Sequence, residues 1–223
     1  MSAQPRHHLD PATLISYASG ALSPELSAIA ATHLDGCAHC RRELARAERI
    51  GGTLMEQQQP AHANGERQQH LRSAMLDLLD APIPDLPDAP APLPPDPDRL
   101  PAPLHPYFGS SLRALKWRWM GPGMRYIRVA GPTGGTLLML KIGPGRRMPV
   151  HSHQGSELTQ ILHGAYDDAL GHFAVGDVAD LDAQVEHQPT TAAGVPCICV
   201  AALDAPLRFQ SWLARKLQPV FGI

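Results

Sequence analysis

The first 80 residues place apolar side chains at the spacing of amphipathic helices. This pattern predicts four helices, over residues 10–20, 23–36, 37–55 and 66–79. The first two are expected to begin with a capping side chain followed by proline, and each ends at a glycine. The third opens at a cysteine, and a polar stretch separates it from the fourth.

The fourth expected helix carries an apolar stripe made of Leu71, Met75, Leu78 and Leu79. The stripe either packs on the first three helices or docks on a partner protein. Three short helices and a detached fourth form a poor core for 80 residues. A bound metal is one way to supply the missing stability.

A proline-rich segment follows over residues 81–106, with eleven of the 23 prolines of the chain and four aspartates. Such a segment is expected to be an extended, semi-stiff spacer that marks a domain boundary. A proline-rich ligand for an SH3-like partner is the alternative, and the linker is favoured.

From residue 107 onward the chain changes to short apolar segments separated by glycine and proline turns. Strands are expected over residues 125–130, 136–142, 156–162, 197–203 and 207–213. Many short strands favour an all-β sandwich or barrel. The fold class is therefore multidomain α + β. We expect a helical domain over residues 1–80, a linker over 81–106 and a β-domain over 107–223.

Composition and charge narrow the function classes. The net charge of −2 over 223 residues argues against a protein that follows nucleic-acid phosphates. Residues 1–80 hold seven Lys and Arg against nine Asp and Glu, a net of −2, which disfavours a zinc-finger-like DNA binder. The sequence shows no apolar run of about 18 residues and no signal peptide, so a soluble cytoplasmic protein is expected. Four cysteines, two of them in a C-x2-C, fit metal ligation in a reducing cytosol.

The segment T-H-L-D-G-C-A-H-C-R at residues 32–41 carries the first candidate metal site. His33, Cys37 and Cys40 form an H-x3-C-x2-C array, which suits Zn²⁺. Two buried cysteines and a solvated histidine are the alternative, but the helical phase turns all three side chains inward. A tetrahedral site needs a fourth donor, and His7 and His8 near the N-terminus both offer one.

Residues 145–164 hold a second candidate, which follows the pattern G-x5-H-x-H-x3-E-x6-G. His151 and His153 lie two residues apart, so on a strand they point to the same face, and Glu157 follows a short turn. The pattern matches the first motif of the cupin superfamily at every fixed position. The second cupin motif usually has a histidine eleven residues after a glycine, and here that residue is His187.

The second cupin motif is altered around this histidine, because Asp182, Gln184 and Thr191 replace its usual proline, glycine and asparagine. The strand turn is therefore expected to differ although the ligand spacing is kept. Three imidazoles and one carboxylate suit Zn, Fe, Mn or Ni alike.

Other histidines and cysteines of the β-domain are expected to have ordinary roles. His163 and His172 are interpreted as hydrogen-bonded core or surface residues. Cys197 and Cys199 lie on one face of an apolar strand and are interpreted as inert buried thiols. Redox sensing is the less favoured alternative, since it requires exposure and a lowered pKa.

A helical H-x3-C-x2-C module, a proline-rich linker and a cupin, in this order, resemble the ChrR-type zinc-binding anti-sigma factors of bacteria. The resemblance covers nearly the whole chain. It includes H-H-L-D-P-A-T-L-I-S-Y-A-S-G, T-H-L-D-G-C-A-H-C, H-S-H-Q-G-S-E-L-T and P-C-I-C-V-A-A-L-D-A-P-L-R-F. It implies that His8 completes the zinc site, with His7 as the neighbour able to substitute.

The resemblance also implies a function. The N-terminal domain of this family binds an extracytoplasmic-function-type sigma factor and blocks its association with core RNA polymerase. The cupin-like domain binds a second zinc and is needed for release of the sigma factor under singlet oxygen or organic hydroperoxide stress. By this resemblance the chain is a regulator and not an enzyme, with no direct binding of DNA and no membrane association.

A metal-dependent cupin enzyme of the dioxygenase type, with a helical zinc appendage, is the alternative function. The same set of three histidines and one glutamate is catalytic in several cupins. An enzyme of this kind predicts an open coordination position, a roomy apolar pocket and turnover of a small substrate.

Overall fold

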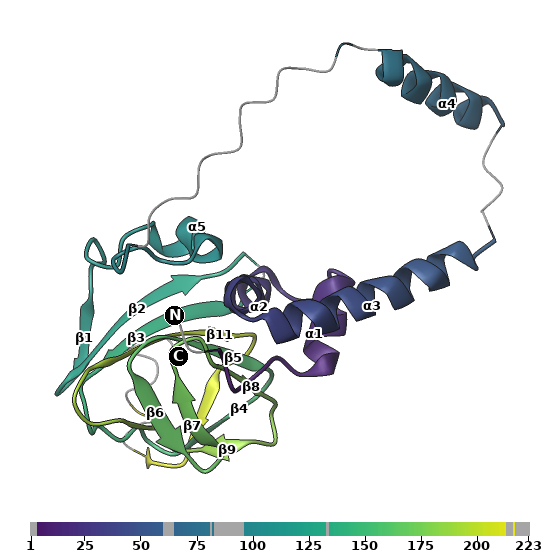
Figure 1. Cartoon of the computed structure of the whole chain (residues 1–223). Helices are drawn as coiled ribbons and strands as arrows, with labels where there is room; N and C mark the ends of the chain where they lie inside the picture. The colour runs from purple at the N-terminus through teal and green to yellow at the C-terminus, as the bar shows by residue number, and fades with distance from the viewer. Residues whose placement is uncertain are drawn as a thin grey trace. The chain divides into compact units, whose positions relative to one another are not determined.

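The computed structural model describes residues 4–59, 65–80, 82, 96–132, 134–212 and 216 (Figure 1). The chain divides into two compact units. Met1–Gly51 together with Asp98–Ile223 form the first unit, and Gly52–Pro97 form the second.

The four helices expected from the sequence are confirmed, with bounds that differ by at most two residues. Their bounds are α1 Pro11–Ala18, α2 Pro24–Gly36, α3 Ala38–Glu56 and α4 Gly65–Asp80. The side chain of Asp10 accepts the backbone N–H of Ala12, and that of Ser23 accepts the N–H of Leu26. None of the described helices has the length and apolar character needed to cross a membrane.

Antiparallel sheets make up the β-domain, which confirms the expected α + β class. The largest sheet has six strands in the order β1-β2-β3-β11-β5-β8. Its strands are β1 Arg118–Gly121, β2 Met124–Ala130, β3 Thr136–Ile142, β11 Cys197–Leu203, β5 Glu157–His163 and β8 Val178–Leu181. A three-stranded sheet contains β10 Thr190–Thr191, β6 Ala165–Asp168 and β7 Gly171–Ala174. Another contains β12 Leu207–Phe209, β4 His151–His153 and β9 Glu186–His187.

The sequence predicts five strands, and the described part of the β-domain adds seven short ones, of two to four residues each. These segments carry too few apolar side chains to show a period of two. The last expected strand, 207–213, is shorter than predicted, because β12 ends at Phe209. Residue 213 lies outside the described residues.

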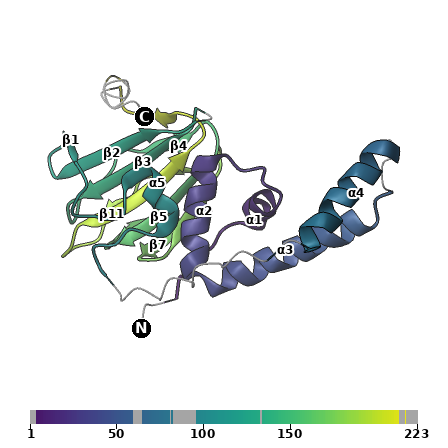
Figure 2. The ribbon, with the colours of Figure 1, turned by 90° about the horizontal axis from the view of Figure 1, so that it is seen from above.

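The six-stranded sheet is buried on both faces. On β3, Leu138 and Leu140 belong to the core between the sheets, whereas Leu137 and Met139 belong to a second core on the opposite face. The second core is shared with the helices: Leu26, Ile29 and Ala30 of α2 pack there with Leu158 and Val200 of the sheet. Figure 2 shows α2 lying along this face. The first helices and the β-domain therefore share one hydrophobic core.

The described end of the proline-rich segment is folded, unlike the extended spacer that its composition predicts. Ala102–Leu104 form a 3-10 helix, η1, and His105–Phe108 form a short helix, α5. The side chains of Leu100 and Leu104 are buried, and η1 contacts α2. Prolines at the first positions of a helix lose no hydrogen bond, so the leucines can bury apolar surface here. Residues 81 and 83–95 lie outside the described residues, and the division at 81–106 stays a prediction.

A buried carboxylate fixes the first turn of α2 against the connection between β2 and β3. Glu25 is fully buried, and its side chain fills the space above Gly131 and Gly135. A Cβ added at Gly131 would lie 1.4 Å from Glu25 Oε1 and 2.5 Å from its Cγ. The glycines are thus required by the close approach of the helix.

Gly131→Ala is expected to destabilise the protein by about 1–3 kcal/mol, because the fully buried Glu25 side chain would have to shift to make room for the added methyl group. Urea unfolding of the full chain, followed by circular dichroism, measures this loss. Gly121→Ala is the control, since a Cβ there meets no atom within 4 Å. Equal stability of the two variants would contradict the packing described here.

Candidate metal centres

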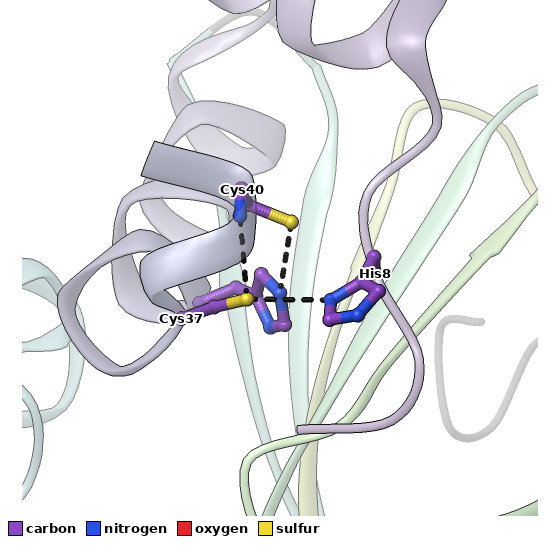
Figure 3. A group of neighbouring side chains, drawn as sticks. His8, Cys37 and Cys40 are labelled. Atoms are coloured by element: carbon purple, nitrogen blue, oxygen red, sulfur yellow. Dashed lines mark hydrogen bonds between the residues drawn. The ribbon is translucent and has the colours of Figure 1, made fainter. Parts of the chain in front are cut away.

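The first centre consists of His8, His33, Cys37 and Cys40, whose ligand atoms all lie within 4.8 Å of one another. His33 lies in the last turn of α2. His8 precedes α1, Cys37 lies between α2 and α3, and Cys40 lies in the first turn of α3 (Figure 3). The distance from Cys37 Sγ to His8 Nδ1 is 3.3 Å, and that from Cys40 Sγ to His33 Nε2 is 3.4 Å. Three separate segments thus converge on one point.

The structure brings His8, and not His7, into this group. The His7 ring stacks on Phe173 with ring centroids 3.9 Å apart. Its Nε2 lies 3.0 Å from the carbonyl oxygen of His172. His7 therefore anchors the N-terminal segment to the β-domain.

The protonation states at the first centre suit a divalent metal. Burial lowers the pKa of His33, and burial together with the nearby His39 lowers the pKa of His8, so both imidazoles are neutral near pH 7. Burial raises the pKa of the Cys40 thiol to about 12. A bound dication would supply the positive charge that stabilises two buried thiolates. Two thiolates and two neutral imidazoles in a closed, buried group fit a tetrahedral Zn²⁺.

The second centre is built by the pairing of β4 with β9. His151 lies opposite His187 in the register, and their Nε2 atoms are 3.1 Å apart. His153 lies on the same face of β4 and is buried, and its Nε2 has no hydrogen-bond partner among the described residues, whereas its Nδ1 faces Glu157. A buried imidazole with one nitrogen held by a carboxylate and the other free, next to two other imidazoles, fits a metal ligand.

Glu157, at the start of β5, lies beside the three imidazoles, with Oε2 3.0 Å from His153 Nδ1. Burial alone would raise the pKa of Glu157, but His153 and the other two imidazoles lower it to about 2. Glu157 is therefore a carboxylate within reach of the histidine group. The four residues expected from the cupin pattern are thus neighbours in the structure.

Neighbouring groups hold these side chains in place, and most of these groups could not be identified from sequence patterns. Asp168 Oδ2 lies 3.1 Å from His187 Nδ1, and the carbonyl of Pro149 accepts from His151 Nδ1 at 2.8 Å. The hydroxyl of Thr159 donates to Glu157 Oε1 at 2.7 Å. Such partners fix ring orientation and tautomer at metal sites. Asp168 ends a short polar strand, so neither spacing nor periodicity distinguishes it.

The remaining histidines and cysteines of the β-domain lie outside both groups. His163 Nδ1 lies 3.0 Å from the carbonyl of Pro196, and His172 Nδ1 lies 2.7 Å from Asp167 Oδ1. Cys197 and Cys199 are free and buried. Contact with the Cys197 thiol, together with burial, raises the pKa of Cys199, which disfavours a reactive thiolate at that residue.

A small apolar cavity of about 70 Å³ adjoins the second centre. Its lining includes His151, Glu157, His187, Cys199 and Phe209. Substrate pockets of enzymes commonly measure about 300–1,000 Å³. The cavity is therefore too small for most organic substrates without rearrangement.

Comparisons with known proteins find relatives that cover both the helices and the β-domain. The model of the family described as ChrR cupin-like domain matches residues 109–205. The anti-sigma-E factor ChrR of Cereibacter sphaeroides is 40% identical over 224 residues, which cover 98% of this chain and 99% of that protein. The crystal structure of Rhodobacter sphaeroides SigE in complex with the anti-sigma ChrR matches 90% of this chain and 100% of the solved chain. In that comparison the identity is 34% and the TM-score is 0.69.

Proposed function

Because this chain belongs to the ChrR family of anti-sigma factors, we propose that it binds an extracytoplasmic-function-type sigma factor and blocks its association with core RNA polymerase. The observation that carries this function is the likeness to an anti-sigma factor over 98% of the chain. The fold supports the proposal, because it brings together both candidate ligand groups and packs α2 on the β-domain. A cupin enzyme is not favoured by a cavity of about 70 Å³.

Two helices present apolar side chains that suit a sigma-factor surface. Ile50, Leu54 and Met55 are exposed on the second half of α3. On α4 the exposed apolar side chains are Leu71, Met75, Leu76, Leu78 and Leu79. A 16-residue helix with such a stripe gains little stability alone and is stabilised by a partner that covers it. We assign the sigma-binding surface to these two helices.

The two metal centres have different proposed roles. The first binds Zn²⁺ through four protein donors, so it has no open position and acts structurally. Its residues hold the N-terminal segment, α2 and α3 together. The second binds zinc or another divalent metal through His151, His153, Glu157 and His187. It serves a sensor that releases the sigma factor under singlet oxygen or organic hydroperoxide stress, in the cytoplasm where core RNA polymerase works.

Transcription in vitro tests the proposed function. Core RNA polymerase with an extracytoplasmic-function-type sigma factor from the same organism should lose activity at its promoter when the full chain is added. Gel filtration should show an equimolar complex that excludes core polymerase. Unchanged transcription with every such sigma factor of the organism would refute the proposal.

Changing the apolar face of α4 tests the assigned surface. The double variant Leu71→Asp with Met75→Asp is expected to weaken sigma binding at least tenfold, or about 1.4 kcal/mol, because two charges would have to be buried against the partner. Calorimetric titration measures the change. Ser73→Asp is the control, since residue 73 lies on the other side of the helix from residues 71 and 75. Equal loss in the control would show that charge on α4, and not its apolar face, decides binding.

A further inference from the structure

The turn between β7 and β8 connects the β-domain to the first metal centre. The carbonyl oxygen of Gly176 lies 3.0 Å from His33 Nδ1. A carbonyl can only accept, so Nδ1 carries the proton and Nε2 is left with its lone pair, facing Cys40 Sγ at 3.4 Å. A residue of the β-domain thus sets the tautomer that His33 needs as a ligand.

The next residue of this turn, Asp177, holds the segment that carries the second imidazole. Asp177 is 2% exposed. Its Oδ1 accepts the backbone N–H groups of Arg6 and His7, and its Oδ2 accepts the N–H of Ala174 at 2.8 Å. Hydrogen bonds to a carboxylate are charge-assisted and roughly twice as strong as neutral ones. His8 follows directly, and residues 4–9 belong to no helix or strand of their own.

The turn itself is fixed by the strand that begins at the second centre. The N–H of Gly176 donates to the carbonyl of Ile161, and the N–H of Ile161 donates to the carbonyl of Asp177, both at 3.0 Å. Ile161 lies on β5, whose first residue is Glu157. A rigid, hydrogen-bonded element of the β-domain therefore supports two of the four ligands of the helical centre.

We propose that Asp177 is a positioning residue for the metal centre formed by His8, His33, Cys37 and Cys40. Through this carboxylate, the contact of the β-domain with the N-terminal segment raises the affinity of the first centre for its metal. The coupling is reciprocal, so metal in the first centre also stabilises the contact between the β-domain and the N-terminal segment. The inference rests on the proposed metal site and adds a residue of the β-domain to its support.

Binding of Co²⁺ to the full chain tests this inference. The sulfur-to-cobalt charge-transfer band reports the centre that contains Cys37 and Cys40, and competition with a chelator gives its affinity. Asp177→Ala is expected to weaken Co²⁺ binding at this centre about tenfold or more, the usual effect of losing a supporting residue at a metal site. Asp177→Asn, which keeps a neutral acceptor, is expected to fall between the unmodified protein and Asp177→Ala.

Asp204→Ala is the control, because Asp204 is an exposed aspartate that also accepts a backbone N–H in a turn of the β-domain, from Ser156 at 2.8 Å, and this hydrogen bond stays within the β-domain. Unchanged Co²⁺ affinity in Asp177→Ala, or equal weakening in Asp204→Ala, would overturn the inference. If circular dichroism shows that Asp177→Ala does not fold, Asp177→Asn decides, and an affinity equal to that of the unmodified chain overturns it. Absence of the sulfur-to-cobalt band in the unmodified chain would instead remove the metal site and the inference together.

Discussion

Replacing Cys37 or Cys40 with serine is expected to unfold the helical segments around the first metal centre and to abolish sigma-factor binding. The four donors come from three segments, so a bound metal would join the N-terminal segment, α2 and the start of α3, where His8 also stacks on His39 with ring centroids 4.3 Å apart. The free energy of metal binding at such a site also stabilises the fold, so complete loss of the metal costs of order 10 kcal/mol of folding stability. This exceeds the expected cost of any other substitution considered for this chain.

The measurement combines metal content, circular dichroism and sigma binding on the full chain, because the apolar face of α2 is covered by the β-domain. Each variant should lose one zinc per chain, lose helical signal and no longer bind the sigma factor. Cys197→Ser is the control, since Cys197 is a buried thiol outside both metal groups. Retained helix together with retained sigma binding in the Cys37 and Cys40 variants would reject a structural role for this metal.

The parts of the first centre that are local in the chain could be predicted from the sequence. His33, Cys37 and Cys40 lie within eight residues, and helical phase alone turns them to one side. The fourth donor is 25 residues before His33, and spacing alone left His7 and His8 open. The structure separates them, because the stacking of His7 on Phe173 turns its ring away from the cysteines. That choice depends on a contact between residues 166 positions apart, which no local pattern contains.

The second centre could be predicted because its geometry follows from strand periodicity and a known spacing. His151 and His153 share a face of β4, and strand pairing brings His187 opposite His151. Asp168 and Asp177 could not be predicted, since each acts through a contact far away in the sequence. Their roles depend on which turns and strands meet, and hydrophobic periodicity carries no such information.

The packing of α2 on the large sheet was also missed, although the sequence contained a sign of it. Strands β3 and β11 have apolar residues at nearly every position, and such strands are buried on both faces. The proline-rich segment, interpreted as a linker, predicts two separate domains and no shared core. The chain instead brings α2 back onto the sheet, where its apolar face and the second face of the strands cover each other.

Through this shared core, the large sheet of the β-domain contacts α2 directly. The sheet has the second metal centre on the side of its inner core, and α2 with His33 on the other. Strand β5 contributes to both, since it begins at Glu157 and its Leu158 packs in the core with α2. A single layer of backbone therefore separates the histidine group from α2.

Alanine substitution of the cupin-type ligands is accordingly expected to leave inhibition intact and to abolish the response to oxidant. His151, His153, Glu157 and His187 lie in the β-domain and take no part in the helices assigned to sigma binding, so basal affinity should change little. Release requires a second conformation of the chain with lower affinity for the sigma factor. A tenfold change in this affinity needs a difference of roughly 1.4 kcal/mol in binding free energy between the two conformations. We propose that metal coordination stabilises the conformation with high affinity for the sigma factor, because the ligands join β4, β9 and the start of β5.

The experiment is a promoter reporter in cells that carry each variant, first in the dark and then under singlet-oxygen stress. His163→Ala is the control, because His163 is also on β5, has its Nδ1 3.0 Å from the carbonyl oxygen of Pro196, and lies outside the histidine group. Low basal signal without induction in the four ligand variants, with normal induction in the control, supports a sensor. Full induction in all four would refute it, and metal-dependent turnover of a small substrate by the unmodified chain would restore the enzyme alternative. The two outcomes differ because a sensor needs the metal to hold a conformation, whereas an enzyme needs it to hold a substrate.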